Sequence, residues 1–251
     1  MIKINDIEVT QFTFPGGEVQ VRVTEKLSTT CNLVQAKVHN SDDVMALLMV
    51  KSIIDRKAPE ATCLLEMDYL PYARQDRVCQ EGEAEACKIM IQLINSMSFD
   101  AVHIMDIHNT KMLRFLGKCL HTPQHMIVKN LVDLNEYDFV VAPDAGALPK
   151  IQKLNFPNVI TATKVRDVKT GEITHTEVDV DLPLIKGKKL LIVDDICDGG
   201  RTFIELAKVL RQGEPKLIDL YVTHGIFSKG TDIFDNLINT IHCPNPFKEL
   251  T

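Results

Sequence analysis

Short apolar runs alternate along the chain with longer stretches in which apolar residues recur at helical spacing. The short runs predict buried strands, and they cover residues 31–38, 62–67, 101–106, 138–142, 158–162, 189–193 and 217–222. The first helical pattern follows Ser41, which we interpret as an N-cap. Its expected buried face consists of Val44, Leu47, Leu48 and Ile54.

Two more stretches have the periodicity of amphipathic helices. One is predicted near residues 83–97, and its expected inner face consists of Ala86, Ile89, Met90, Leu93 and Ile94. The other runs from Phe203 to Leu210 and is expected to begin near Thr202. Strands that alternate with helices in this way are typical of an α/β fold, in which helices flank mainly parallel sheets.

The order of elements divides the chain into two α/β halves. The stretch 124–136 (QHMIVKNLVDLNE) is the expected crossing, so we assign residues 1–125 to an N-terminal half and 126–251 to a C-terminal half. Because ligands of such sheets bind at the carboxyl ends of the strands, the residues that follow each strand are the candidates for chemistry.

Composition and charge exclude several classes of function. The chain has 251 residues and a net charge of -6, which disfavours a broad nucleic-acid-binding surface. Its apolar runs are shorter than the roughly 20 residues that a membrane span needs, and the N-terminus lacks a signal-peptide pattern. The seven cysteines are odd in number and lack CxxC spacing. We therefore expect reduced, mostly buried thiols, without disulfides or zinc, in a cytoplasmic protein.

The segment LLIVDDICDGGRT (190–202) combines an apolar strand with carboxylates and glycines. Gly199 and Gly200 permit a tight turn, and the following helix start adds the positive end of its dipole, which together predict an anion-binding nest of phosphate size. Asp194 and Asp195 would lie beside a bound phosphate, where carboxylates accept hydrogen bonds from sugar hydroxyls or hold Mg²⁺ indirectly. No GxxxxGK[ST] motif occurs in the chain, so this is not a Walker A loop.

This segment resembles the ribose-phosphate loop of the phosphoribosyltransferase fold. The other motifs that carry a family resemblance are FPGGE (14–18), YARQDR (72–77), DIH (106–108), PDAG (143–146), KVR (164–166) and THGIFS (223–228). Together they are similar to ribose-phosphate pyrophosphokinase, and the chain resembles a shortened member of that family. The resemblance implies two phosphoribosyltransferase-like halves with the active site between them. It also implies that Mg-ATP gives its β,γ-diphosphate to the anomeric hydroxyl of ribose 5-phosphate, which releases AMP.

The resemblance assigns ATP to the N-terminal half. Phe14 is expected to stack on adenine and Glu18 to bond to its edge, from a hairpin that reaches into a neighbouring subunit; this implies a homo-oligomer, either a dimer or a hexamer. The remaining ATP contacts are assigned to Arg74, Gln75, Asp76, Arg77 and His108. Arginine forks suit polyphosphate oxygens. The imidazole of His108 is expected on the Mg²⁺ that bridges the ATP phosphates.

The resemblance assigns the acceptor to the C-terminal half. Its expected contacts are Asp194, Asp195, Asp198, Gly199, Gly200, Arg201 and Thr202. Asp144 is expected to hold a second Mg²⁺ near the ribose. Lys164 and Arg166 are the expected catalytic pair, in a polar loop that closes over the phosphates, because phosphoryl transfer depends mainly on positioning and on stabilisation of charge.

Departures from the family pattern leave the acceptor open. Gly16 replaces a family aspartate at the adenine edge, and the termini are short, which leaves adenine discrimination and allosteric sites open. Arg201 is an added cation that we expect to reach toward the acceptor's anion. It favours a second interpretation, in which the same diphosphate goes to a larger acceptor such as ADP-ribose. A non-catalytic regulatory homologue and a phosphoribosyltransferase are the two further alternatives.

Overall fold

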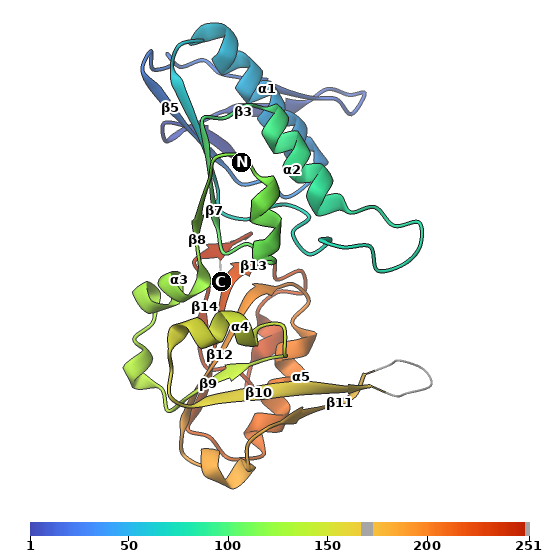
Figure 1. The fold of residues 1–251 in the computed structure, drawn as a ribbon, viewed down its shortest axis with the longest axis vertical. Helices are drawn as coiled ribbons and strands as arrows, with labels where there is room; N and C mark the ends of the chain where they lie inside the picture. Colours follow the sequence, from blue (N-terminus) through green and yellow to red (C-terminus); the bar gives the residue numbers. More distant parts are fainter. Residues whose placement is uncertain (167–172, 249–251) are drawn as a thin grey trace. The chain divides into compact units, whose positions relative to one another are not determined.

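The computed structural model describes residues 1–166 and 173–248 (Figure 1). The chain divides into two compact units, Met1–Thr122 and Pro123–Thr251. The expected crossing 124–136 lies within the second unit, where helix α3 (Gln124–Leu131) and the 3₁₀ turn η2 (Leu134–Glu136) form. The chain therefore passes from one unit to the other just before Pro123, whose fixed backbone angle suits the start of α3.

The first unit is built on a six-stranded sheet with the order β2-β1-β5-β6-β7-β8. Its strands are β1 (Ile2–Ile4), β2 (Ile7–Glu8), β5 (Cys31–Ala36), β6 (Thr62–Met67), β7 (Ala101–Met105) and β8 (Cys119–Thr122). The last four are mutually parallel, whereas β1 is antiparallel to both of its neighbours. A separate hairpin pairs β3 (Thr10–Thr13) with β4 (Val19–Arg22). The helical segments are α1 (Ser41–Lys57), α2 (Ala86–Ser96) and η1 (Thr110–Phe115).

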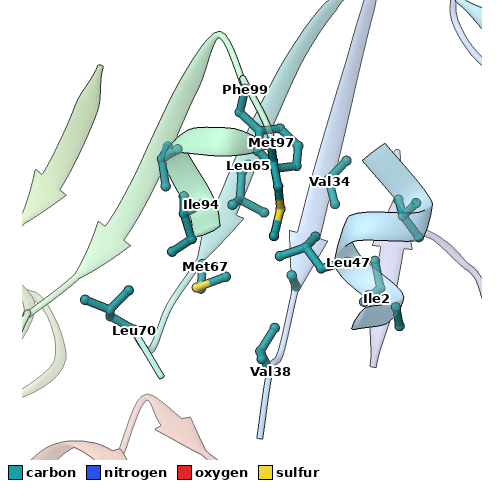
Figure 2. Close-up of a cluster of buried hydrophobic side chains, with 14 of the residues drawn as sticks. Ile2, Val34, Val38, Leu47, Leu65, Met67, Leu70, Ile94, Met97 and Phe99 are labelled. Atoms are coloured by element: carbon teal, nitrogen blue, oxygen red, sulfur yellow. The ribbon is translucent and has the colours of Figure 1, made fainter. Parts of the chain in front are cut away.

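The hydrophobic core of the unit lies against one face of this sheet. Alternate residues of the central strands point to that face, among them Val34, Leu65 and Met67, and they are almost completely buried. Helices α1 and α2 cover these residues with Leu47 and Ile94, as Figure 2 shows. The alternation of apolar positions therefore fixes which face of the sheet the helices cover.

The structure corrects two details of the expected helices. The N-cap of α1 is Asn40, whose side-chain oxygen accepts a hydrogen bond from the Asp43 backbone N–H at 3.0 Å, so Ser41 is the first helical residue. In α2, Ile89 and Leu93 are 49% and 37% exposed. The residues buried in α2 are Cys87, Met90, Ile91 and Ile94. Both faces of α2 carry apolar side chains, so periodicity could not decide which one packs on the sheet.

The second unit has a larger sheet with the order β11-β10-β9-β12-β13-β14, and β15 also pairs with β13. Its strands are β9 (Phe139–Ala142), β10 (Val159–Arg166), β11 (Ile173–Val178), β12 (Lys189–Cys197), β13 (Leu217–Gly225), β14 (Ile241–His242) and β15 (Asn245–Pro246). Only the β10–β11 pair among the described strands of this sheet is antiparallel. The remaining helical segments are α4 (Leu148–Ile151), η3 (Gln152–Leu154), η4 (Leu182–Ile185), α5 (Arg201–Arg211) and η5 (Asp232–Phe234).

Three strands of this sheet continue beyond their apolar runs. β10 extends to Arg166, β12 to Cys197 and β13 to Gly225, because neighbouring strands continue to pair with their polar ends. The predicted fold class is confirmed: each half is a mainly parallel sheet flanked by helices. Among the described residues, no helix has the length and apolar character to cross a membrane.

All seven cysteines are free thiols in the structure, and only Cys63, Cys87 and Cys197 are buried, fewer than expected. Burial raises the pKa of Cys197 to about 12 and that of Cys63 to about 11, which suppresses the reactive thiolate. Cys31 and Cys79 are exposed.

We expect Ellman's reagent to titrate these two thiols rapidly at pH 8 and the other five slowly. Replacing both with serine should abolish the fast phase; a fast phase that survives would contradict the burial pattern.

Candidate active site

The aromatic residues of the β3–β4 hairpin are solvent-accessible. Phe14 is 47% exposed, and its ring packs edge-on against Phe12 with the centroids 5.3 Å apart. The turn is closed by backbone hydrogen bonds that join Phe14 to Glu18 and Gly17 to Phe14, both at 2.8 Å. Glu18 is exposed beside this ring. The hairpin therefore offers a flat apolar surface with a carboxylate next to it.

The YARQDR segment forms a loop after β6, in which Ala73 and Asp76 are buried and the other residues are exposed. Arg74 and Gln75 are exposed, whereas only 6% of Asp76 is accessible. The Asp76 carboxylate accepts hydrogen bonds from Arg77 Nε at 2.9 Å and Arg77 Nη2 at 3.1 Å. These bonds hold the pKa of Asp76 below its usual range. Asp76 therefore stays ionised and orients Arg77.

A second segment meets this loop at the end of β7. Asn109 Nδ2 donates to Asp76 Oδ2 at 2.6 Å, and Asn109 also caps the η1 turn. His108, half-buried beside Asn109, contributes an electrostatic interaction that further lowers the pKa of Asp76. The structure thus joins the arginine loop and the DIH motif through one carboxylate. The sequence motifs did not include Asn109, although an amide next to His108 at a strand end was the signal available.

Asp144 of the second unit follows β9 and begins the turn into α4. Its Oδ1 atom accepts hydrogen bonds from the backbone N–H groups of Gly146 at 2.9 Å and Ala147 at 3.1 Å. The residue is half-buried at the carboxyl end of its strand. β9 is the direct neighbour of β12, so Asp144 lies at the same edge of the sheet as the acidic pair.

Asp194 and Asp195 lie within β12 and not after it, which corrects the expected strand end at 193. Burial raises the pKa of Asp194 well above its usual range, and the neighbouring carboxylates of Asp195 and Asp144 add to this effect. Asp195, only 6% exposed, accepts a hydrogen bond from Lys150 Nζ at 2.9 Å. Burial and repulsion from neighbouring carboxylates therefore make the charged form of Asp194 unfavourable within the strand.

The turn between β12 and α5 is supported by the THGIFS segment. The carbonyl of Cys197 accepts hydrogen bonds from the N–H groups of Ile226 at 2.8 Å and Phe227 at 3.2 Å, and that of Asp198 accepts one from Ser228 at 3.2 Å. Gly200 has a positive φ of 72° and is the N-cap of α5, so the helix starts at Arg201, next to the expected start near Thr202. The turn has the glycine, the helix N-terminus and the small size expected of a phosphate-binding nest.

The two glycines of this turn differ in what a side chain would meet. A Cβ atom at Gly200 would lie 2.6 Å from Phe234 Cζ, whereas one at Gly199 would have no neighbour closer than 3.8 Å. We expect Gly200→Ala to cost about 1–3 kcal/mol through clash and backbone strain, which lowers the melting temperature by several degrees. Gly199→Ala is the matched control and should melt with the wild type. Equal melting temperatures for both variants would contradict this assignment.

The structure pairs Arg201 with a side chain of its own helix, whereas the sequence predicts that it reaches toward the acceptor. Its side chain is 79% exposed, and Nε donates to Glu205 Oε1 at 2.8 Å, one turn along α5. A cation at a helix N-terminus is disfavoured by the dipole, and the pairing with Glu205 offsets that cost. The fork thus lies on the outside of the helix.

This geometry predicts that Arg201 contributes little to acceptor binding. We expect Arg201→Ala to change the Michaelis constant for ribose 5-phosphate by less than about twofold, since exposed i,i+4 pairs contribute only tenths of a kcal/mol. Steady-state kinetics at saturating Mg-ATP measure this, with Glu205→Ala as the control that removes the same pair. A tenfold rise for Arg201→Ala alone would show that the guanidinium moves into the site when the acceptor binds.

Lys164 and Arg166 belong to a strand and not to a loop, which corrects a second expectation. The backbone of β10 pairs Lys164 with Thr176 of β11, and the register shifts between Val165 and Arg166. The side chains of the two cations, and residues 167–172 of the polar segment, lie outside the described residues. Their expected place over the phosphates therefore stays a prediction.

Two family models match the chain in the same order as its two units. The N-terminal domain of ribose phosphate pyrophosphokinase matches residues 1–97, and the phosphoribosyl transferase domain matches residues 125–243. Among curated proteins, ribose-phosphate pyrophosphokinase of Pyrococcus abyssi is 31% identical over 90% of this chain and 79% of its own length. The Pyrococcus furiosus protein of the same name is 28% identical over 99% of this chain and 90% of its own length.

The fold has a counterpart among solved structures. The crystal structure of phosphoribosylpyrophosphate synthetase from Mycobacterium smegmatis superposes with a TM-score of 0.70 at 22% identity. That match covers 87% of this chain and 72% of the other. At this level of identity the likeness concerns the fold.

Proposed function

The chain belongs to the ribose-phosphate pyrophosphokinase family, and from this premise we propose that it transfers the β,γ-diphosphate of Mg-ATP to the anomeric hydroxyl of ribose 5-phosphate. The products are phosphoribosyl pyrophosphate and AMP. Members of this family are diphosphotransferases that form phosphoribosyl pyrophosphate from ATP and ribose 5-phosphate, and this chain is such an enzyme.

The strongest support for the acceptor comes from the turn between β12 and α5. Gly200 brings the backbone close to the ligand, and the N-terminus of α5 provides N–H donors for the 5′-phosphate, with Asp198, Gly199 and Thr202 beside it. Asp194 and Asp195 accept hydrogen bonds from the ribose hydroxyls. The hydroxyls of a bound sugar are further donors for these carboxylates and offset the cost of their burial.

ATP is assigned to the loops of the first unit. Arg77, oriented by Asp76, and the exposed Arg74 and Gln75 contact the triphosphate oxygens, where charge-assisted bonds from a fork are strong. Phe14 stacks on the adenine, and Glu18 accepts from its edge. Because the β3–β4 hairpin presents these groups to solvent in the single chain, we propose that it serves the ATP site of a neighbouring copy in a homo-oligomer.

The available donors fit magnesium held mainly by the substrates. Among the described residues, no group of three or more His, Cys, Asp or Glu side chains is placed to bind a metal on its own. Mg²⁺ usually keeps several waters and takes one or two carboxylates plus phosphate oxygens, which suits Asp144 near the acceptor. The imidazole of His108 would be a nitrogen ligand near ATP, assigned by the family resemblance alone. When bound, Mg²⁺ neutralises phosphate charge. Lys164 and Arg166 then stabilise the negative charge that develops on the transferring group.

AMP release distinguishes this function from its alternatives. The purified chain is incubated with Mg-ATP and ribose 5-phosphate, with ADP-ribose, or without an acceptor, and AMP is quantified by chromatography. We expect AMP to form in step with phosphoribosyl pyrophosphate only when ribose 5-phosphate is present. AMP formation with ADP-ribose alone would favour a larger acceptor, and no AMP in any reaction would favour a non-catalytic homologue. The pairing of Arg201 with Glu205 supports ribose 5-phosphate over ADP-ribose, because Arg201 was the residue that favoured the larger acceptor.

A further inference from the structure

A lysine outside all of the recognised motifs contacts the acidic pair. Lys150 lies on α4, and its Nζ atom donates to Asp195 Oδ2 at 2.9 Å. The two side chains are only 18% and 8% exposed. An ion pair this deep differs from a surface salt bridge, because removing one partner leaves a buried charge without compensation.

The surroundings of this pair are strongly negative. Asp194 is adjacent to Asp195 in β12, and Asp144 is close enough to act electrostatically on Asp194. Neighbouring carboxylates repel one another, which favours rotation of a side chain away from the others. The ammonium of Lys150 opposes this rotation at Asp195.

α4 also connects the two acidic positions mechanically. The turn that starts this helix provides the N–H groups that hold Asp144 Oδ1, at Gly146 and Ala147. Lys150 comes from the same short helix and holds Asp195. The turn and the helix that follows it thus orient one carboxylate after β9 and another within β12, and the proposed function uses both.

We propose that Lys150 is a positioning residue for the acceptor: its ammonium fixes the orientation of the Asp195 carboxylate, to which the ribose hydroxyls donate hydrogen bonds. This inference rests on the proposed function. Lys150 acts through Asp195 and does not itself contact the sugar or the transferred diphosphate. Its effect should therefore appear in acceptor binding and depend on the presence of Asp195.

The test is a double-mutant cycle on the full-length enzyme. Its variants are Lys150→Met, Lys150→Arg, Asp195→Asn and Lys150→Met/Asp195→Asn. Steady-state kinetics give kcat and the Michaelis constants for ribose 5-phosphate and ATP, and calorimetric titration with ribose 5-phosphate gives its affinity directly. Loss of a partner from a buried charge pair is costly, so Lys150→Met should weaken ribose 5-phosphate binding on the order of 10- to 100-fold.

Three further results are expected if Lys150 positions Asp195. The Michaelis constant for ATP should change by less than about twofold, because its proposed contacts lie elsewhere, and Lys150→Arg should recover most of the acceptor affinity since the charge is kept. In the Asp195→Asn background, adding Lys150→Met should change acceptor affinity by less than about threefold, because the ammonium has already lost its charged partner. If Lys150→Met fails to fold, this last comparison still decides, since the double variant contains neither charge of the pair.

Other outcomes would overturn the inference. Additive effects of the two substitutions on acceptor affinity would mean that Lys150 acts independently of Asp195, for example by direct contact with the ligand. Equal losses for ATP and ribose 5-phosphate would indicate a general structural role. Failure of the proposed function is separate: the wild-type enzyme would then form no AMP. Wild-type enzyme that binds no ribose 5-phosphate in the calorimeter would overturn both.

Discussion

Replacing Lys164 with alanine is expected to lower kcat by roughly 10³-fold or more, the range in which loss of a transition-state cation falls. ATP affinity should stay nearly unchanged, because the cation is needed mainly when negative charge develops on the transferring diphosphate. Lys164 lies near the end of β10, where pairing with β11 fixes the position of its backbone. Steady-state kinetics and equilibrium titration with ATP measure the two quantities separately.

Lys186→Ala is the control for this experiment. Lys186 is 70% exposed and pairs with Glu214 on the surface of the same unit, so its loss removes an equal charge without touching the proposed site. It should turn over at the wild-type rate. A Lys164→Ala enzyme within about threefold of the wild-type kcat would reject the catalytic assignment, as would a parallel loss of ATP affinity, since uniform binding does not raise kcat.

Replacing both members of the acidic pair should separate the two substrates. We expect Asp194→Asn/Asp195→Asn to weaken ribose 5-phosphate binding on the order of 10²-fold or more, because two hydrogen bonds to charged acceptors are lost. ATP binding should change by less than about twofold, since its contacts are assigned to the first unit. Asp235→Asn is the control, because Asp235 is an exposed carboxylate of the same unit. Equal weakening of both substrates would contradict the assignment.

Asp194, which is assigned to acceptor binding, is also expected to lower the stability of the folded protein at neutral pH. The raised pKa of Asp194 means that the folded protein holds this proton more tightly than the unfolded chain does. The stability contributed by the proton is complete below the unfolded pKa, about 3.9, and is lost as the pH rises through the higher folded pKa.

Asp194→Asn alone should therefore melt at a higher temperature than the wild type at pH 7 in metal-free buffer. Each kcal/mol of relief corresponds to about 2–4 °C for a chain of this size. The difference should shrink toward pH 4, where the wild-type carboxyl is protonated as well. A variant less stable than the wild type at pH 7 would mean that Asp194 is held by favourable contacts and not strained by its burial.

Strands and tight turns could be predicted from the sequence for a physical reason. Buried parallel strands need continuous apolar runs, so β6 (Thr62–Met67) was predicted with the observed boundaries. Glycine at positive φ is required by the backbone itself, which is why Gly200 could be singled out before any contact was known. Features that depend on local chain geometry were therefore accessible from the sequence.

Features that depend on which side chains meet in space were not accessible. Arg201 is next to the glycine turn in sequence, but α5 directs it to Glu205. Lys150 is 45 residues from Asp195, and no spacing rule connects them. Asp76 belongs to a recognised motif, yet its bond to Asn109 crosses 33 residues. In each case the decisive information is a tertiary contact or the rotation of a helix.

The hydrogen bonds from Ile226, Phe227 and Ser228 have a consequence for the thermodynamics of ligand binding. They fix the carbonyl groups of Cys197 and Asp198 through contacts within the unit, so folding itself orders the turn. Ordering a residue's backbone costs about 1–2 kcal/mol, and a turn formed in advance spares the ligand that entropic penalty. Anion capture should therefore have a small unfavourable conformational entropy, and selectivity should arise from how well a ligand matches a nest whose shape is already set.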